Sequence, residues 1–167
     1  MNTDAATKQP LVEHLLMLPA DQIAYDSLPT ETLSALALQM TDPFIATSAL
    51  GELAQRDSQK TKDAATHILD RDPWDRHLTA FALDLLYDRD PEKGFLQMAR
   101  LVVGCKEPKL LEAMIENILS DLDRYRTGDA ATLAKVVASQ VTALPLESFS
   151  DLEQRDRFFD VFGGAGC

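Results

Sequence analysis

Residues 70–91 read DRDPWDRHLTAFALDLLYDRDP, and this stretch decides the fold. Between its two Asp-Arg-Asp-Pro tetrapeptides, apolar residues recur three or four positions apart, which is the spacing of one helix face. Asp72 is placed to cap this helix, and Pro73 fits its first position, where no amide hydrogen is needed. The pattern predicts a helix over 73–88 with an apolar stripe made of Trp74, Leu78, Phe81, Ala82, Leu85 and Leu86.

The same helix-start pattern recurs along the chain. Proline follows a possible capping residue at the start of three more predicted helices, over 43–56, 91–104 and 108–123. Ser58 is the candidate cap of another helix, over 59–70. Alternating apolar and polar residues are almost absent, and no Asn-Gly or Asp-Gly hairpin turn occurs, so strands are not expected. Weaker helical patterns cover 10–18, 20–27, 31–40, 129–143 and 150–162.

The helix junctions repeat at a regular interval. Arg56-Asp57-Ser58 is a close variant of the two Asp-Arg-Asp-Pro junctions, and the equivalent aspartates are Asp57, Asp72 and Asp90. When the sequence is shifted by 33, residues 49–57 lie over residues 82–90 with five identities in nine positions. The short turns require neighbouring helices to run antiparallel. Paired helices with a period of this length are typical of α-solenoids.

This part of the chain, about 42–143, resembles the HEAT and armadillo-like repeat families. Pro43 and residues 46–53 carry the resemblance in one unit, and Pro73 and residues 76–86 carry it in the next. Residues 108–143 form a weaker third unit, which departs from the family pattern because its turn is longer, and a regular Arg on each second helix is missing. The resemblance implies a short right-handed stack of antiparallel helix pairs, about nine or ten helices, with a curved protein-binding surface.

Length and charge limit the classes of protein to which this chain belongs. Its 167 residues suffice for one domain, 1–167, with loose tails expected at 1–9 and 163–167. A net charge of −11 repels nucleic-acid phosphates and anionic membranes and favours a basic partner, although acidity also serves plain solubility. Two isolated cysteines, Cys105 and Cys167, form neither a disulfide framework nor a zinc site. We expect a cytoplasmic protein, because no signal core or spanning apolar run occurs.

The densest group of possible metal ligands is Asp70, Asp72, Asp75 and His77. It raises the alternative of a helical enzyme that binds a metal or another small ligand. However, Asp72 is needed as a helix cap, and Asp75 falls in a first turn, where a carboxylate complements the helix dipole. No calcium loop, phosphate-binding loop or nucleophile elbow is present. The sequence therefore predicts no catalytic residue, no metal ligand and no cofactor.

Acidic side chains form the candidate partner surface. Glu112, Glu116 and Asp123 share one face of the helix over 108–123, and further acids lie at residues 84–92. Such a run is usually a solvated helix face, but two adjacent acidic faces also suit a basic partner. The only tryptophan is either a core anchor or an exposed binding hot spot. The predicted partner-binding residues are Trp74, Asp75, Asp84, Asp88, Glu92, Glu112, Glu116 and Asp123.

These features together predict a non-enzymatic protein-binding module. The most specific expectation is an immunity protein, an acidic inhibitor that neutralises a basic toxin or effector. An adaptor or an assembly chaperone is the alternative that would share the same sequence features. The aromatic residues Phe158, Phe159 and Phe162 are expected to close the end of the helix stack or, alternatively, to dock another protein.

Overall fold

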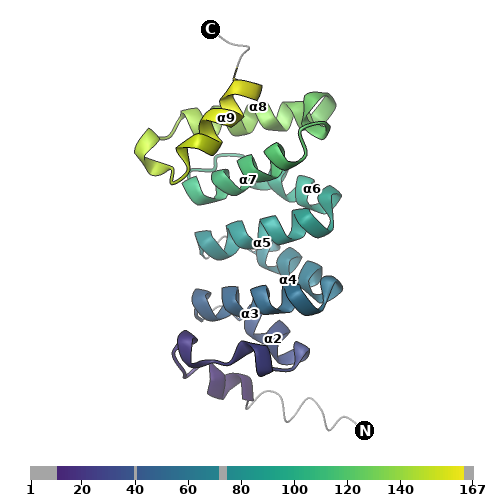
Figure 1. Cartoon of the computed structure of the whole chain (residues 1–167), viewed down its shortest axis with the longest axis vertical. Helices are drawn as coiled ribbons and strands as arrows, with labels where there is room; N and C mark the ends of the chain where they lie inside the picture. The colour runs from purple at the N-terminus through teal and green to yellow at the C-terminus, as the bar shows by residue number, and fades with distance from the viewer. Residues whose placement is uncertain (1–10, 40, 72–74, 164–167) are drawn as a thin grey trace. The chain divides into compact units, whose positions relative to one another are not determined.

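The computed structural model describes residues 11–39, 41–71 and 75–163, and these ranges contain helices but no strand (Figure 1). The prediction of an all-α chain is confirmed. Residues 11–15 are helical, and the later α-helices are α2 (Thr30–Ala37), α3 (Pro43–Arg56), α4 (Ser58–Asp70), α5 (Arg76–Arg89), α6 (Pro91–Leu101), α7 (Pro108–Ser120), α8 (Gly128–Thr142) and α9 (Leu152–Phe162). Short 3-10 turns are η1 (Ala20–Gln22), η2 (Tyr25–Ser27), η3 (Arg124–Arg126) and η4 (Leu146–Ser148).

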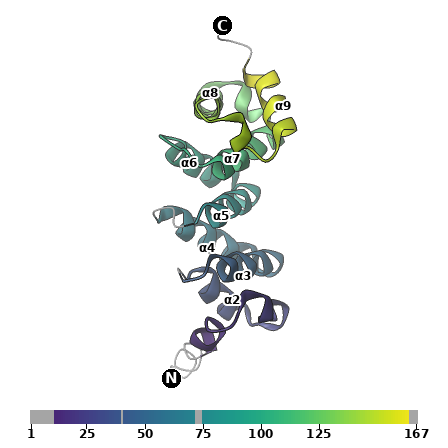
Figure 2. The same cartoon turned by 90° about the vertical axis from the view of Figure 1, so that its left-hand side faces the viewer.

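The chain divides into two compact units, residues 1–85 and residues 86–167. In the first unit α3 packs against both α2 and α4, and η1 and η2 also contact α3. In the second unit α7 packs against α8, and α9 contacts both of these helices; Figure 2 shows α8 almost end-on with α9 beside it. Each unit therefore has a core of its own between antiparallel neighbours, built from leucine, isoleucine, alanine and methionine side chains.

Aspartate side chains cap the helices, as the sequence indicates, but not always at the predicted residue. Asp42 accepts hydrogen bonds from the amides of Phe44 and Ile45, as expected. The cap of α4 is Asp57 rather than Ser58, which is the first helical residue. At α5, the prediction of a start at Pro73 behind Asp72 is wrong, because the helix begins at Arg76.

The actual cap of α5 is Asp75, which the sequence placed in the first turn. Its carboxylate accepts from the amides of His77 at 2.9 Å and Leu78 at 2.8 Å. Two aspartates three positions apart are equally good capping residues, so sequence alone does not choose between them. The residues 72–74, which include Trp74, lie outside the described ranges.

With the helix bounds of the structure, the repeat of 33 residues is more regular. Both α3 and α5 contain 14 residues. The same offset of 33 in residue number separates the start of α3 at Pro43 from that of α5 at Arg76, and the start of α4 at Ser58 from that of α6 at Pro91. Equivalent positions are buried in α3 and α5: Ile45 and Leu78, Ala46 and Thr79, Ala49 and Ala82, Leu50 and Leu83, Leu53 and Leu86. The period weakens afterwards, because η3 is inserted before α8.

Arginines at the helix junctions of the first unit bind the backbone of earlier segments. Arg56 donates to the carbonyl oxygens of Leu28 at 2.7 Å, Tyr25 at 3.3 Å and Asp26, and to the Glu52 carboxylate. These bonds fix η2 against the end of α3. Arg71 donates to the carbonyl oxygen of Leu38 at 3.3 Å. Leu38 is the C-cap residue of α2. A guanidinium suits this task because several donors project from one plane.

Several predicted boundaries differ from the structure by a few residues. The segment over 20–27 forms two 3-10 turns rather than one helix, and α6 and α7 end at Leu101 and Ser120 rather than at the predicted positions 104 and 123. Gly163 is the C-cap of α9, whereas the other residues of the predicted tails lie outside the described ranges. Helix ends are the least certain part of any assignment based on a sequence pattern.

Candidate protein-binding groove

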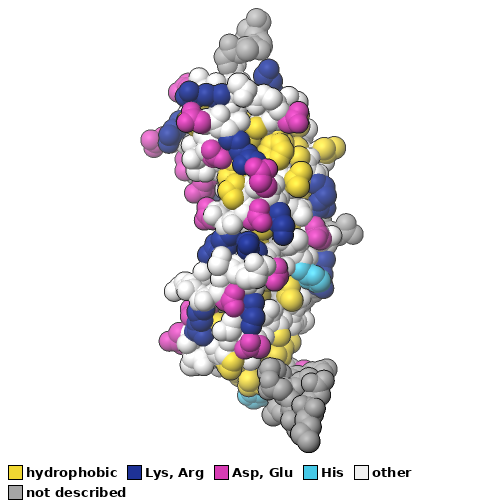
Figure 3. Space-filling view, turned by 90° about the vertical axis from the view of Figure 1, so that its right-hand side faces the viewer, with side chains coloured by type: hydrophobic (Ala, Val, Ile, Leu, Met, Phe, Trp, Pro, Cys, Tyr) yellow, Lys and Arg dark blue, Asp and Glu magenta, His cyan; other side chains and the backbone are white. Residues whose placement is uncertain are grey.

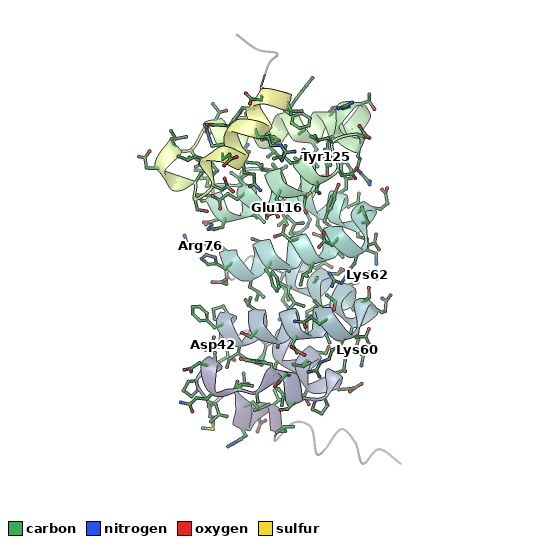
Figure 4. The ribbon with its side chains drawn as sticks, viewed as in Figure 1. Asp42, Lys60, Lys62, Arg76, Glu116 and Tyr125 are labelled. Carbon is green, nitrogen blue, oxygen red and sulfur yellow. The ribbon has the colours of Figure 1, made fainter. Side chains whose placement is uncertain are left out.

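A groove of about 520 Å³ lies between α7 and α9 in the second unit. Three of its lining residues come from α7 and share one helix face, since they are spaced i, i+3 and i+4. The others come from the start of α9. The lining residues are Glu116, Leu119, Ser120, Asp151, Glu153, Gln154 and Arg157. We call this the α7–α9 groove; Glu116 is labelled in Figure 4.

The lining of the α7–α9 groove is predominantly acidic. Glu116, Asp151 and Glu153 contribute carboxylates, and Arg157 contributes one guanidinium. Leu119 supplies an apolar side chain beside them. Glu116 and Glu153 are exposed, so water and large ligands reach them. A surface of this kind suits a cationic side chain with an aliphatic stem, as in lysine or arginine.

The wall of the groove formed by α9 is attached to α7 by Glu112. Its carboxylate accepts hydrogen bonds from the Ser150 amide, from the Ser150 hydroxyl at 2.8 and 2.9 Å, and from the Asp151 amide at 3.3 Å. Lys109 donates to the same carboxylate at 2.8 Å and to the Ser150 hydroxyl at 2.5 Å. We call these contacts the Glu112 clasp.

The electrostatics of the Glu112 clasp favour an ionised carboxylate. Burial raises the pKa of Glu112, but the hydrogen bonds from Lys109, Ser150 and Asp151 outweigh this effect, so its pKa lies below the ordinary value. The Glu112 side chain is only 12% exposed. Its negative charge is therefore already engaged within the chain, whereas Glu116, one turn further along α7, is exposed.

Further interactions stabilise α9 and the segment that leads into it. Asp151 caps the helix, accepting from the Gln154 amide at 2.8 Å. On another side of α9, the Arg155 guanidinium lies over the rings of Phe149 and Phe159, 5.8 and 4.8 Å from their centroids. Phe158 is fully buried and contacts the rings of Phe159 and Phe162. The aromatic residues of α9 thus stabilise its packing on the second unit.

Other acids of the predicted surface are paired with arginines. Glu92 forms a 2.7 Å ion pair with Arg124, whose guanidinium also lies over the Phe95 ring. Asp123 lies 3.5 Å from Arg126, and both side chains are highly exposed. Surface pairs of this kind contribute little to stability and exchange partners readily. They are therefore compatible with a binding surface, but they do not define one.

The remaining predicted residues do not join the α7–α9 groove. Asp88 is exposed at the end of α5. In the first unit, Asp84 is half-buried and engaged in interactions, and Asp75 is occupied as a cap. Trp74 lies outside the described residues.

Sequence reasoning missed three charged residues of the groove: Asp151, Glu153 and Arg157. The Ser-Asp pair at 150–151 does signal a helix start. No local pattern shows, however, that the helix after it returns to α7.

The alternative metal or ligand centre does not assemble in the part of the chain that the structure describes. Asp75 uses its carboxylate for the cap, His77 is exposed, and Asp72 is outside the described ranges. Among the described residues, no three His, Cys, Asp or Glu side chains are arranged to hold a metal ion. Cys105 is buried, which raises the pKa of its thiol.

A smaller groove of about 380 Å³ lies between α2 and α4 in the first unit. Lys60, labelled in Figure 4, bridges it to Glu31 at 2.6 Å, and this partner raises the pKa of the ammonium group. Asp63 and His67 also line the groove, and Gln59 donates to Asp63 at 2.9 Å. The Lys60–Glu31 ion pair neutralises two of the charges in this lining.

Comparisons with known proteins do not assign this chain to a family. The chain matches no protein-family model, and no curated protein or solved structure is similar enough to count as a match. Among the described residues, no helix combines the length and the apolar character needed to cross a membrane. The chemistry of the α7–α9 groove is therefore the basis for a proposed function.

Proposed function

We propose that this chain is a non-enzymatic protein-binding module of the HEAT-like α-solenoid kind. In this proposal the α7–α9 groove receives basic side chains of a partner protein, and the chain acts as an inhibitor of that partner. An immunity protein that neutralises a basic toxin or effector in the cytoplasm is the most specific form of the proposal. The regular interval between the capped helix pairs supports the solenoid part.

The acidic lining of the α7–α9 groove is the observation that carries the proposal. Glu116, Asp151 and Glu153 face one guanidinium, within a chain whose net charge is −11. Long-range attraction from the whole chain would speed the encounter with a basic protein. The groove carboxylates would then position its basic side chains. Because α9 is held by the Glu112 clasp, the groove is available without folding on binding, which avoids an ordering cost.

The decisive experiment is affinity capture from the native source with the tagged chain, followed by binding measurements on the captured protein. The test variant combines Glu116→Lys with Glu153→Lys. The control combines Glu13→Lys with Asp21→Lys, two exposed acids of the first unit, so that both variants change the net charge equally. We expect one stoichiometric basic partner, whose affinity falls at least tenfold in the groove variant and much less in the control.

Three outcomes separate the possible roles. Inhibition of the captured protein's activity by the chain would support the inhibitor proposal. A captured partner whose activity is unchanged would favour an adaptor or assembly chaperone. Equal weakening by both variants would mean that net charge, not the groove, governs binding, and the groove would lose its assignment.

A further inference from the structure

The outward face of α6 differs in chemistry from the rest of this acidic chain. Lys93, Leu96 and Arg100 follow the i, i+3, i+7 pattern of one helix face, and Val103 lies in the turn just beyond the end of α6. All four are exposed, as is Lys106 beyond the helix end. We call these five residues the α6 stripe. Figure 3 shows that exposed hydrophobic side chains do lie among charged ones on one face of the second unit.

The α6 stripe contains the most exposed aliphatic side chains that are described in the second unit. Leu96 is 65% and Val103 is 78% exposed, against 49% for Leu146, the next highest. Leu96 lies on α6, and Val103 lies just beyond its end at Leu101. Such large apolar side chains in aqueous solvent contribute nothing to the core, and burial by a partner would release their hydration water.

The segment that carries these two side chains has an excess of basic residues. Residues 93–106 include three cations and no carboxylate, in a chain with 27 acids. Arg100 is held along the helix by hydrogen bonds to Gln97 at 3.0 and 2.8 Å. Two exposed acids border this segment: Glu92, which forms an ion pair with Arg124, and Glu107. The stripe therefore has the opposite charge preference to the α7–α9 groove.

We propose that the α6 stripe is a docking surface for an acidic amphipathic helix of a partner protein. The matching helix carries apolar side chains along one face, which cover Leu96 and Val103, with carboxylates beside them for Lys93 and Arg100. Charge complementarity determines this choice of partner. An anionic membrane is a poorer occupant, because the rest of the chain carries a large negative charge and only two aliphatic side chains would insert.

This surface is independent of the groove, so the two proposals can fail separately. The probe is a fluorescein-labelled helical peptide of about 18 residues with leucines along one face and glutamates on both sides of them. Anisotropy titrations with the whole chain should show saturable binding that weakens with salt. Leu96→Ser and Arg100→Glu should each weaken binding at least tenfold, whereas the groove variant Glu116→Lys with Glu153→Lys should not weaken it.

Matched controls are an exposed aliphatic and an exposed cation elsewhere in the second unit. Val161→Ser on α9 and Lys135→Glu on α8 should leave the affinity within twofold of the original chain. Circular dichroism checks that every variant retains its helix content. A peptide in which the glutamates are replaced by lysines should not bind the stripe.

Other occupants are distinguishable in the same series. Absence of saturable binding, or equal binding by the stripe variants, would overturn the proposal. Binding to phosphatidylserine vesicles that depends on Leu96, without binding to the peptide, would assign the stripe to a membrane surface instead. Concentration-dependent sedimentation that Leu96→Ser abolishes, again without peptide binding, would identify a second copy of this chain as the occupant.

Discussion

The hydroxyl of Ser150 donates a bifurcated hydrogen bond to both oxygens of the Glu112 carboxylate, which lies 38 positions earlier in the chain. This carboxylate also accepts from the amides of Ser150 and Asp151, and it pairs with Lys109. One side chain of α7 thus accepts hydrogen bonds from the backbone amides that precede α9. Without it, the amides at 150 and 151 would need water, and the wall of the groove would lose its attachment to α7.

Replacement of Glu112 should therefore destabilise the second unit. Glu112→Gln removes the charge and one acceptor, and we expect the free energy of unfolding to fall by about 1–3 kcal/mol, the usual range for bonds to a charged group. Urea unfolding followed by circular dichroism measures the change. Glu116→Gln, on an exposed position of the same helix, is the control and should stay within about 0.5 kcal/mol. Equal effects in both variants would contradict the clasp.

The same contact should depend on pH in a defined direction. The pKa of Glu112 is lowered in the folded chain, so its contribution to stability is fully present above the ordinary value of 4.5 and is lost as the pH falls through the lowered pKa. The stability difference between the original chain and Glu112→Gln should be constant from pH 7 to about pH 5 and should shrink at lower pH. A difference that grows on acidification would refute this sign.

The cap of α4 offers a test at neighbouring residues. Asp57→Ala removes the acceptor of the Lys60 amide and should cost about 1 kcal/mol of unfolding free energy. Ser58→Ala changes the first helical residue, which makes no capping bond, and should be nearly neutral or slightly stabilising, because alanine has the higher helix propensity. Thermal unfolding of both variants decides the question; the reverse order would restore Ser58 as the cap.

Much of the fold was predictable because its signals are local. Proline after a capping residue, apolar spacing of three and four, and the regular interval between junctions depend only on the order of residues along the chain. Ambiguity remained where two capping residues compete. Asp72 and Asp75 are both candidate caps for α5, and Asp57 and Ser58 are both candidate caps for α4; the choice depends on packing that the local pattern does not contain.

The candidate site was less predictable, because it combines segments that are distant in sequence. Glu112 and Glu116 share a helix face, so the sequence alone does not distinguish between them. The structure separates them, since the return of α9 engages Glu112 and leaves Glu116 at the groove. Exposure of Leu96 on an apparently ordinary helix face likewise becomes visible only when its neighbours are in place. Charge patterning indicated acidity, but not which carboxylates are already engaged.

Arg56 provides a test of the junction arginines. Its guanidinium donates to three carbonyl oxygens between Tyr25 and Leu28, which the single ammonium of lysine cannot reproduce. Arg56→Lys should lower the free energy of unfolding by about 1 kcal/mol and should speed amide hydrogen exchange in η2. Arg76→Lys, at an exposed helix start, is the control and should change neither quantity. Unchanged exchange in η2 would show that α3 holds this segment by packing alone.

Two helical glycines should respond in opposite ways to the same substitution. A Cβ at Gly94 in α6 would lie 2.7 Å from the Tyr87 Cα, which is backbone and does not rotate away. At Gly51 in α3 the nearest heavy atom is Phe81 Cζ at 3.6 Å, an ordinary van der Waals distance. Alanine favours a helix over glycine by about 1 kcal/mol, whereas overpacking against a fixed backbone costs about 1–3 kcal/mol or more.

Gly51→Ala should therefore raise the free energy of unfolding by up to about 1 kcal/mol, and Gly94→Ala should lower it by about 1–2 kcal/mol. Denaturant unfolding measures both changes. Tyr87 is buried and its hydroxyl donates to Asp121 at 3.3 Å, so a shift of the tyrosine away from the new methyl group would also disturb that bond. Stabilisation by both substitutions would mean that α6 and Tyr87 separate at little cost and that their close approach is not required for the fold.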